Sequence, residues 1–298
     1  MGFTELIRAL PNVHFKENYP MSLHTGLAVG GKAKYFIAPE TVNTVKNAVR
    51  IAKENGVPVK AVGNGTNLLV SDYGFDGLIV SSNNLTYKLL DKGDVIALCG
   101  AQLSSFIRFA AGNGFTGMEG LFGIPATVGG AVCQNAGAFG YTISDYITEV
   151  TAIENGELKR YFKSDCKFGY RESLFSSGDR FIVSARFKFP KRKTAVKRQE
   201  YFKYRSIRAG AQPVGRNCGS VFKNPKGDYA ARLIEGAGLK GFRIGGAFVS
   251  DMHANFILTD KGASAKDVYS VIAEIKKRVY EKYGVTLDEE VEFLGVFK

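Results

Sequence analysis

Cysteine and histidine are scarce in this sequence, and long hydrophobic runs are missing. The 298 residues include four cysteines and three histidines, and no two cysteines form a Cys-x-x-Cys pair. A disulfide framework and a zinc site are therefore not expected. No apolar run reaches the roughly 18 residues of a membrane helix, and residues 1–10 have no apolar core typical of a signal peptide. These absences predict a reduced, cytoplasmic protein without a bound metal or a membrane partner.

Positive charge is in excess, but it is unevenly distributed. The formal net charge is +12, and residues 186–208 alone hold ten Lys and Arg against one Glu. Because Phe and Tyr interleave with this basic run, it could follow a nucleic acid. Alternatively, it is a solvated helix or linker near a site for anionic small molecules. The aromatic spacing suits a strand followed by a helix, which favours the second explanation and no nucleic-acid partner.

Hydrophobic periodicity alternates between the patterns of helices and strands along the chain. The clearest helix is 264–284, which Ser264 and Asp267 can cap and Gly284 can end. A hairpin is expected over 146–162, with Asn155 and Gly156 at its turn. Further helices are expected at 41–55, 102–113 and 229–239, and further strands at 57–63, 68–72, 76–82 and 181–189. The pattern predicts a mixed α and β protein of three units, 1–80, 81–195 and 196–298.

Two glycine-rich stretches show neither helical nor strand periodicity. "GIPATVGGAVCQNAGAFG", residues 123–140, holds five Gly and four Ala, which predicts a loop that a ligand approaches closely. "GNGTN", residues 63–67, follows an expected strand, and its glycines allow a turn whose main-chain N–H groups bind an anion. A simple tight turn is the alternative at 63–67. Together, the two loops could close on one diphosphate.

Two familiar phosphate-binding motifs fail at decisive positions. "GLAVGGKA", residues 26–33, has the glycine and lysine spacing of a P-loop, but Ala33 has no hydroxyl for a magnesium ion. "GNGTNL" opens like a dinucleotide-binding fingerprint, but Leu68 stands at the third glycine position and no helix is expected to follow. The sequence therefore predicts neither site.

Five motifs together resemble one known family. "GNGTNLLV" (63–70), "GMEGLFGIPATVGGAVCQNAGAFG" (117–140), "YRES" (170–173), "GSVFKNP" (219–225) and "LDEEVEFLG" (287–295) occur in this order in the UDP-N-acetylenolpyruvoylglucosamine reductase family. The resemblance covers nearly the whole chain, from about residue 20. The short distance between "YRES" and the third unit is similar to the compact type II subtype, which lacks an extra substrate-covering loop.

The resemblance implies an α+β fold for the chain. Residues 1–80 and 81–195 would be the two lobes of an FAD-binding module of the vanillyl-alcohol-oxidase/PCMH type. Residues 196–298 would be an α+β substrate-binding domain, whose C-terminal strand returns toward the flavin. The oligomeric state does not follow from the sequence, although a monomer is favoured.

The resemblance also implies an activity, which belongs to peptidoglycan precursor synthesis. NADPH would reduce a non-covalently bound FAD, which then reduces UDP-N-acetylglucosamine enolpyruvate to UDP-N-acetylmuramate. The implied cofactor-binding residues lie in the two glycine-rich stretches: Gly63, Asn64, Gly65, Thr66, Asn67, Gly123, Ile124, Pro125, Thr127, Gly129, Gly130, Asn135, Gly137 and Ala138.

Three residues match the family's catalytic positions. Hydride addition to an enol ether conjugated to a carboxylate pushes negative charge onto that carboxylate, so the site needs a cation or acid there and a proton donor. By resemblance, Arg171 stabilises the carboxylate and Ser220 protonates C2. Glu290 would polarise or protonate the same carboxylate, and Glu289 is the alternative to Glu290.

Substrate contacts are implied at three further positions. Asn224 matches a family position near the UDP-sugar, whereas Arg208 and His253 are assigned by their spacing from the catalytic residues. His253 has a purely structural alternative. Such families often carry Arg two residues after the catalytic Glu, where this chain has Glu292. Two other functions stay open: another FAD-dependent oxidoreductase of the same fold, and a nucleic-acid-binding protein that uses residues 186–208.

Overall fold

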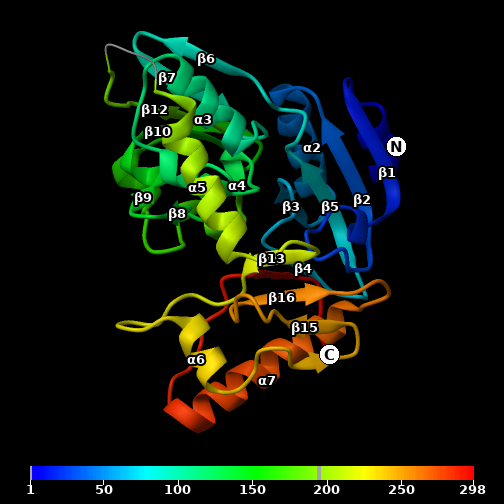
Figure 1. Cartoon of the computed structure of the whole chain (residues 1–298). Helices are drawn as coiled ribbons and strands as arrows, with labels where there is room; N and C mark the ends of the chain where they lie inside the picture. The colour runs from blue at the N-terminus through cyan, green and yellow to red at the C-terminus, as the bar shows by residue number, and fades with distance from the viewer. Residues whose placement is uncertain (1, 193–195) are drawn as a thin grey trace. The chain divides into compact units, whose positions relative to one another are not determined.

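The computed structural model describes residues 2–192 and 196–298, which pack as two compact units (Figure 1). Unit 1 comprises Met1–Glu17, Tyr35–Asn64 and Gly77–Ile207. Unit 2 comprises Asn18–Lys34, Gly65–Asp76 and Arg208–Lys298. The division into three domains at residues 80 and 195 stays a prediction.

A four-stranded sheet lies near the N-terminus, in the order β1-β2-β5-β3. Its strands are β1 (Val13–Pro20), β2 (Lys32–Pro39), β5 (Phe75–Ser81) and β3 (Val59–Val62), and its helices are α1 (Phe3–Arg8) and α2 (Val42–Glu54). Thr41 begins α2 by accepting a hydrogen bond from Thr44 N–H, which satisfies a donor left open by the first turn. The buried face of α2, which includes Val45 and Ala48, then packs into the core of unit 1.

The second sheet of unit 1 has five antiparallel strands, in the order β11-β10-β12-β7-β6. These are β11 (Glu157–Phe162), β10 (Ile147–Glu154), β12 (Arg180–Phe187), β7 (Asp94–Leu98) and β6 (Lys88–Asp91). Asn155 and Gly156 join β10 to β11, both with positive φ. That backbone is the one a two-residue hairpin turn requires, and it confirms the expected Asn-Gly turn.

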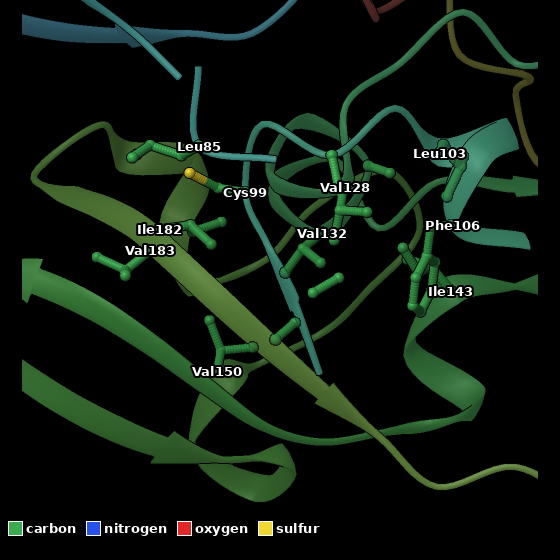
Figure 2. Close-up of a cluster of buried hydrophobic side chains, with 14 of the residues drawn as sticks. Leu85, Cys99, Leu103, Phe106, Val128, Val132, Ile143, Val150, Ile182 and Val183 are labelled. Carbon is green, nitrogen blue, oxygen red and sulfur yellow. The ribbon is translucent and has the colours of Figure 1, made fainter. Parts of the chain in front are cut away.

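Three further helices begin in unit 1, and one of them, α4, packs on this sheet against β12 and β7. They are α3 (Leu103–Gly112), α4 (Val128–Cys133) and α5 (Arg198–Ala211). On α4, Val128 and Val132 lie one turn apart on the same face, and both are fully buried. Figure 2 shows them in the same cluster as Val150 of β10 and Ile182 of β12. Apolar burial therefore holds α4, which is too short to be stable alone.

Unit 2 has its own sheet and its own core. The sheet has the order β13-β16-β15-β14, and β4 with β17 forms a separate, parallel two-stranded sheet. Ser264 accepts from Asp267 N–H to begin α7, and Gly284 ends it in the left-handed conformation, as expected. The elements are β13 (Asn217–Ser220), α6 (Ala230–Gly236), β14 (Arg243–Ile244), β15 (Ala247–Val249), β16 (Phe256–Thr259), α7 (Ala265–Tyr283), β4 (Leu68–Val70) and β17 (Glu292–Leu294).

The expected helices and strands are confirmed to within a few residues, but the loop prediction for 123–140 is wrong in part. This stretch contains α4 and a small hairpin, β8 (Gly137–Ala138) with β9 (Tyr141–Thr142). Thr127 caps α4 by accepting from Gly130 N–H. Two glycines among only six residues conceal the helical pattern in the sequence. Five short 3-10 helices complete the described elements: Met21–Leu23, Glu119–Leu121, Ile143–Asp145, Lys163–Cys166 and Leu174–Ser177.

The aromatic residues of the basic run have structural roles. Tyr201 and Phe202 of α5 both pack on Phe122, with ring centroids 4.9 and 5.0 Å away. The rings of Tyr201 and Phe202 are therefore packed within unit 1, whereas most basic side chains of α5 are exposed to solvent. The expectation that residues 186–208 have no nucleic-acid partner stays a prediction. Among the described residues, no helix is long and apolar enough to cross a membrane.

Candidate active site

Inside unit 1, the first two residues of the stretch 63–67 contact the stretch 123–140 or its surroundings. A Cβ atom at Gly63 would lie 2.5 Å from Oγ1 of Thr127, so only glycine permits this approach. Next to it, the Asn64 side chain exchanges two hydrogen bonds with Gln102, at 2.8 and 3.0 Å, and donates to the Pro125 carbonyl. The main-chain N–H groups of Asn64 and Gly65 donate to no described residue. These donors remain available to an anion.

The adjacent glycines of α4 differ in what surrounds them. A Cβ at Gly129 would come within 2.7 Å of Cys99 Cβ, so protein packing requires that glycine. A Cβ at Gly130 would meet only Thr127 Oγ1, at 3.4 Å, and Gly130 is exposed. No protein contact therefore requires glycine at position 130, although glycine weakens a helix by about 1 kcal/mol relative to alanine. Open space beside an exposed glycine, with main-chain donors nearby, fits a large phosphate-bearing cofactor.

Arg171 has a left-handed backbone conformation. Its φ is +57°, and the Gly169 N–H donates to the Glu172 carbonyl across the turn that contains it. This conformation is unfavourable for residues with a Cβ atom and is usual for glycine or asparagine. The guanidinium Nη2 donates to the Gly137 carbonyl at 2.9 Å, and the guanidinium carbon lies 5.1 Å from the centre of the Tyr170 ring. Strained backbone of this kind often accompanies function.

Three side chains join the Arg171 turn to the glycine-rich stretch. Asn135 Nδ2 donates to the Gly169 carbonyl at 2.7 Å. The hydroxyls of Ser173 and Ser176 both donate to the Cys133 carbonyl, at 2.7 and 3.0 Å. Together with the bond from Arg171 to Gly137, these contacts attach the turn to the end of α4 and to β8.

Unit 2 brings Ser220 and Glu290 onto neighbouring backbone segments. The Glu290 N–H donates to the carbonyl of Val221, the residue after Ser220, at 2.8 Å. The register of β13 against β16 shifts before Ser220, where Gly219 has a φ of +77°. The Ser220 hydroxyl is half-buried and bonds to no described residue, which leaves it available to a ligand.

A buried asparagine that the sequence analysis did not identify holds this region together. Asn255 Oδ1 accepts from Phe222 N–H at 2.9 Å, and its Nδ2 donates to the Phe222 carbonyl at 2.8 Å. Its main-chain carbonyl accepts from Val221 N–H at 2.9 Å. The Val221 peptide thus lies between Asn255 on one side and Glu290 on the other. No sequence pattern marks Asn255, because its role depends on residues more than thirty positions away.

The structure distinguishes Glu290 from its neighbour Glu289. Glu289 Oε1 pairs with Lys276 Nζ of α7 at 2.7 Å, so its carboxylate has a structural partner. The Glu290 carbonyl accepts from Asn67 Nδ2 at 2.9 Å, while the Asn67 carbonyl accepts from Glu292 N–H at 3.0 Å. Asn67, expected at the cofactor, thus fixes the backbone on both sides of Val291. The ion pair gives Glu289 a structural role, and the assignment of the functional carboxylate to Glu290 stays a prediction.

The expected substrate residues have partly structural surroundings. Asn224 Oδ1 accepts from Ala230 N–H, which supports the first turn of α6. His253 Nδ1 accepts from Asn255 N–H at 3.3 Å, and burial lowers the pKa of its imidazole. Arg208 is half-buried on α5. His253 therefore supports the Asn255 network, whatever else it contacts.

The cysteines are all free thiols. Cys218 lies two residues before Ser220 and is 3% exposed. Burial, with a smaller effect of the Glu290 charge, raises the pKa of its thiol to about 12. It therefore stays protonated near neutral pH and is not a thiolate nucleophile. Among the described residues, no group of three or more His, Cys, Asp or Glu could hold a metal ion.

Comparison with known proteins identifies the family. Residues 211–294 match the C-terminal domain of UDP-N-acetylenolpyruvoylglucosamine reductase, and residues 33–160 match an FAD binding domain. The reductase of Carboxydothermus hydrogenoformans is 41% identical over 94% of this chain and 93% of its own length. That of Caldicellulosiruptor saccharolyticus is 37% identical over 96% and 94%.

This chain belongs to the UDP-N-acetylenolpyruvoylglucosamine reductase family.

A solved structure agrees with this assignment. The crystal structure of UDP-N-acetylenolpyruvylglucosamine reductase from Thermus caldophilus aligns with a TM-score of 0.77 and 32% identity, over 95% of this chain and 99% of that one. The resemblance seen in the sequence is therefore confirmed, as is the α+β fold with an FAD-binding module and a C-terminal domain. As a member of this reductase family, the chain is an FAD-dependent oxidoreductase.

The comparisons do not assign individual site residues, so geometry is the evidence for each. In unit 1, Gly63, Asn64, Pro125, Thr127, Asn135 and Gly137 lie on contacts that join the two glycine-rich stretches or attach the Arg171 turn. In unit 2, Asn67, Ser220 and Glu290 lie on adjoining segments. Ser176 and Asn255 extend these networks beyond the residues of the sequence motifs.

Proposed function

We propose that this family member reduces UDP-N-acetylglucosamine enolpyruvate to UDP-N-acetylmuramate, with NADPH as the source of hydride and FAD as the carrier. Membership of the reductase family supports the reaction. The main structural support for the residue roles is Arg171. Its backbone is in the left-handed conformation, and its guanidinium donates to the Gly137 carbonyl of the glycine-rich stretch. Because the left-handed conformation is unfavourable for arginine, its presence at this position indicates that the positive charge is required.

The main-chain donors of the glycine-rich stretches are suited to the FAD diphosphate. Asn64 contributes a main-chain N–H that bonds to no described residue, and Gly130 leaves space where any side chain would protrude. When bound, the flavin supplies a hydride to C3 of the enolpyruvyl group. The chain itself supplies the charge stabilisation and the proton that this addition requires.

Arg171 acts on the carboxylate of the enolpyruvyl group. Hydride addition at C3 places negative charge on C2, and conjugation spreads it onto that carboxylate. A guanidinium offers two parallel N–H donors to such a group and stays protonated throughout. Its bond to the Gly137 carbonyl fixes one nitrogen and restricts the orientation of the rest.

Ser220 delivers the proton to C2 from its hydroxyl, and Glu290 acts beside it on the substrate carboxylate. A serine hydroxyl is a weak acid, so the transfer requires a strongly basic acceptor such as the developing carbanion. The Ser220 hydroxyl has no described partner that would compete for it. The hydrogen bond from Glu290 N–H to Val221 fixes the spacing of the two segments.

The proposal also includes the substrate-binding residues and the cellular location of the protein. Asn224, Arg208 and His253 contact the UDP-sugar, and the excess of positive charge draws in a substrate and cofactors that are all anionic. Four free thiols fit a reducing, cytoplasmic location, where NADPH and nucleotide sugars are made.

Anaerobic stopped-flow spectroscopy of the flavin tests the proposal by separating the two half-reactions. Ser220→Ala should leave flavin reduction by NADPH nearly unchanged. Flavin reoxidation by UDP-N-acetylglucosamine enolpyruvate should slow by about 10²–10⁴-fold, the usual contribution of a proton donor. Ser270→Ala on α7 is the matched control and should alter neither rate.

Two results would contradict the proposal. An equal loss in both half-reactions would remove Ser220 from the proton-transfer step. Reduction of the flavin by NADPH without reoxidation by the substrate in the unmodified protein would favour a different FAD-dependent oxidoreductase.

A further inference from the structure

The tip of the β8–β9 hairpin carries an aromatic residue in a backbone conformation that aromatic residues rarely adopt. Phe139 has a φ of +53°, and Gly140 after it has a φ of +79°. Two successive residues with positive φ form a tight hairpin turn, which favours asparagine at its first position. A bulky side chain in this conformation is an outlier. Phenylalanine therefore stands at position 139 against the local backbone preference.

Two other hairpins of unit 1 have the same kind of turn and show which residues it contains elsewhere. Lys92 and Gly93 join β6 to β7, and Asn155 and Gly156 join β10 to β11, all with positive φ. The first residue of each turn is polar and exposed to solvent. Phe139 is 45% exposed, so burial of its ring does not explain the departure from this pattern.

The attachment of this hairpin to the rest of unit 1 depends mainly on Tyr141. A Cβ atom at Gly120 would overlap the Tyr141 ring, so the two residues pack closely. The hydroxyls of Tyr141 and of Tyr204 on α5 lie 3.3 Å apart. Phe139 adds a ring contact to Tyr204, with centroids 5.3 Å apart, yet nearly half of its side chain stays exposed. The exposed part of the ring is accessible to a ligand.

The hairpin also places this ring near cationic side chains of unit 1. The Gly137 carbonyl accepts from Arg171 Nη2 at 2.9 Å, and Phe139 follows Gly137 by two residues. At about 3.3 Å per residue of extended chain, the two backbones lie within about 7 Å of each other. On α5, Lys203 Nζ lies 4.8 Å from the centre of the Tyr204 ring. An exposed aromatic ring with cations nearby suits a ligand that combines a planar ring with negative charge.

We propose that the ring of Phe139 stacks on the heteroaromatic ring of a nucleotide that binds beside Arg171. The proposal rests on the proposed function, whose ligands FAD, NADPH and UDP-N-acetylglucosamine enolpyruvate each carry such a ring and a diphosphate. Offset stacking of two planar rings is attractive beyond the apolar area that it buries. Asparagine would relieve the backbone at position 139 but could not stack. Recognition of the ligand thus explains why the turn contains phenylalanine.

Binding measurements on Phe139→Asn and Phe139→Tyr test the proposal. Phe139→Asn removes the ring and should weaken the binding of one ligand by about 5- to 100-fold, the usual contribution of a base that stacks on an aromatic side chain. Phe139→Tyr keeps a ring and should retain the affinity. Fluorescence titration of the apoprotein gives the affinity for FAD. Stopped-flow rates at varied NADPH or substrate concentration give the other two affinities, so the affected ligand identifies the source of the stacked ring.

Asn155→Phe is the matched control, because it places phenylalanine at the same position of the β10–β11 turn. It should lower the urea midpoint of the apoprotein and leave all three affinities unchanged. Phe139→Asn should not lower that midpoint, since asparagine suits the turn. Unchanged affinity for all three ligands in Phe139→Asn, or an equal loss of affinity in Phe139→Tyr, would overturn the stacking role.

Failure of the proposed function has a different result. If the substrate does not reoxidise the reduced flavin of the unmodified protein, the proposed function fails, and the affinities for FAD and NADPH still test the stacking role. If the unmodified protein completes both half-reactions and Phe139→Asn binds all three ligands normally, only the stacking role fails.

Discussion

At the scale of single residues, backbone strain gathers around the candidate site. Nine described residues other than glycine have positive φ. Four of them, Asn135, Phe139, Lys167 and Arg171, lie on the glycine-rich stretch or on the segment that it anchors. Strain of this kind persists only where surrounding contacts outweigh it. For Arg171 and Asn135, the hydrogen bonds to the Gly137 and Gly169 carbonyls are among those contacts.

Comparing Arg171→Gly with Arg171→Ala separates the strain of the left-handed backbone at residue 171 from the chemical role of the guanidinium. Both changes remove the guanidinium, so both should slow flavin reoxidation by substrate. Because glycine adopts positive φ freely, Arg171→Gly should be about 1 kcal/mol more stable to unfolding than Arg171→Ala. Urea denaturation of the two apoproteins measures this difference. Identical unfolding midpoints would show that the left-handed conformation stores no strain.

At the scale of elements, α4 joins the core to the candidate cofactor site. Val128 and Val132 face the core, Gly129 packs against Cys99, and Gly130 faces outward. A six-residue helix of this composition would not form by itself. Its inner face therefore determines where it lies, and its outer face is free to serve a ligand.

Alanine substitutions at the two glycines of α4 should have opposite effects on the apoprotein. Gly130→Ala should stabilise it by up to about 1 kcal/mol, since alanine favours the helix. The same change should weaken FAD binding, because the new methyl group projects toward the ligand. Gly129→Ala should destabilise the fold by about 1–3 kcal/mol through its clash with Cys99. Denaturation of the apoproteins and fluorescence titration with FAD measure both quantities, and undiminished FAD affinity in Gly130→Ala would contradict this interpretation of α4.

Elements marked by local sequence patterns could be predicted from the sequence, whereas elements stabilised by residues distant in the sequence could not. The cap and stop residues of α7 and the Asn-Gly turn between β10 and β11 act locally, so their patterns were sufficient. Helix α4 lacked such a pattern, because burial against the sheet selects it. Similarly, the motifs indicated Arg171, Ser220 and Glu290, but nothing local marked Asn255 or Ser176. Their roles depend on carbonyl and N–H groups that only the folded chain brings near.

At the scale of the whole molecule, each unit is built from segments that are not consecutive in the sequence. The core of unit 2 includes Leu27 and Leu69 as well as the buried face of α7. Strand β17 pairs in parallel with β4, and Asp72 accepts from the N–H groups of Ala265 and Lys266. Unit 2 is therefore incomplete without the segments 18–34 and 65–76.

A fragment that contains only residues 208–298 should fail to form this unit cooperatively. It lacks β4 and two buried leucines, so β17 has no strand partner and part of the core is exposed to water. Thermal unfolding followed by near-ultraviolet circular dichroism should show no sharp transition, in contrast to the full chain. A cooperative transition in the fragment would show that the two earlier segments are dispensable.

The pairing of β4 with β17 also has a consequence for biosynthesis. Leu69 is synthesised early, yet its opposite residue, Phe293, follows 224 positions later in the chain. At roughly 5–20 residues per second, a ribosome needs about ten to forty-five seconds to cover that distance. During this interval an apolar strand has no native partner, so we expect the nascent chain to depend on chaperones until β17 emerges.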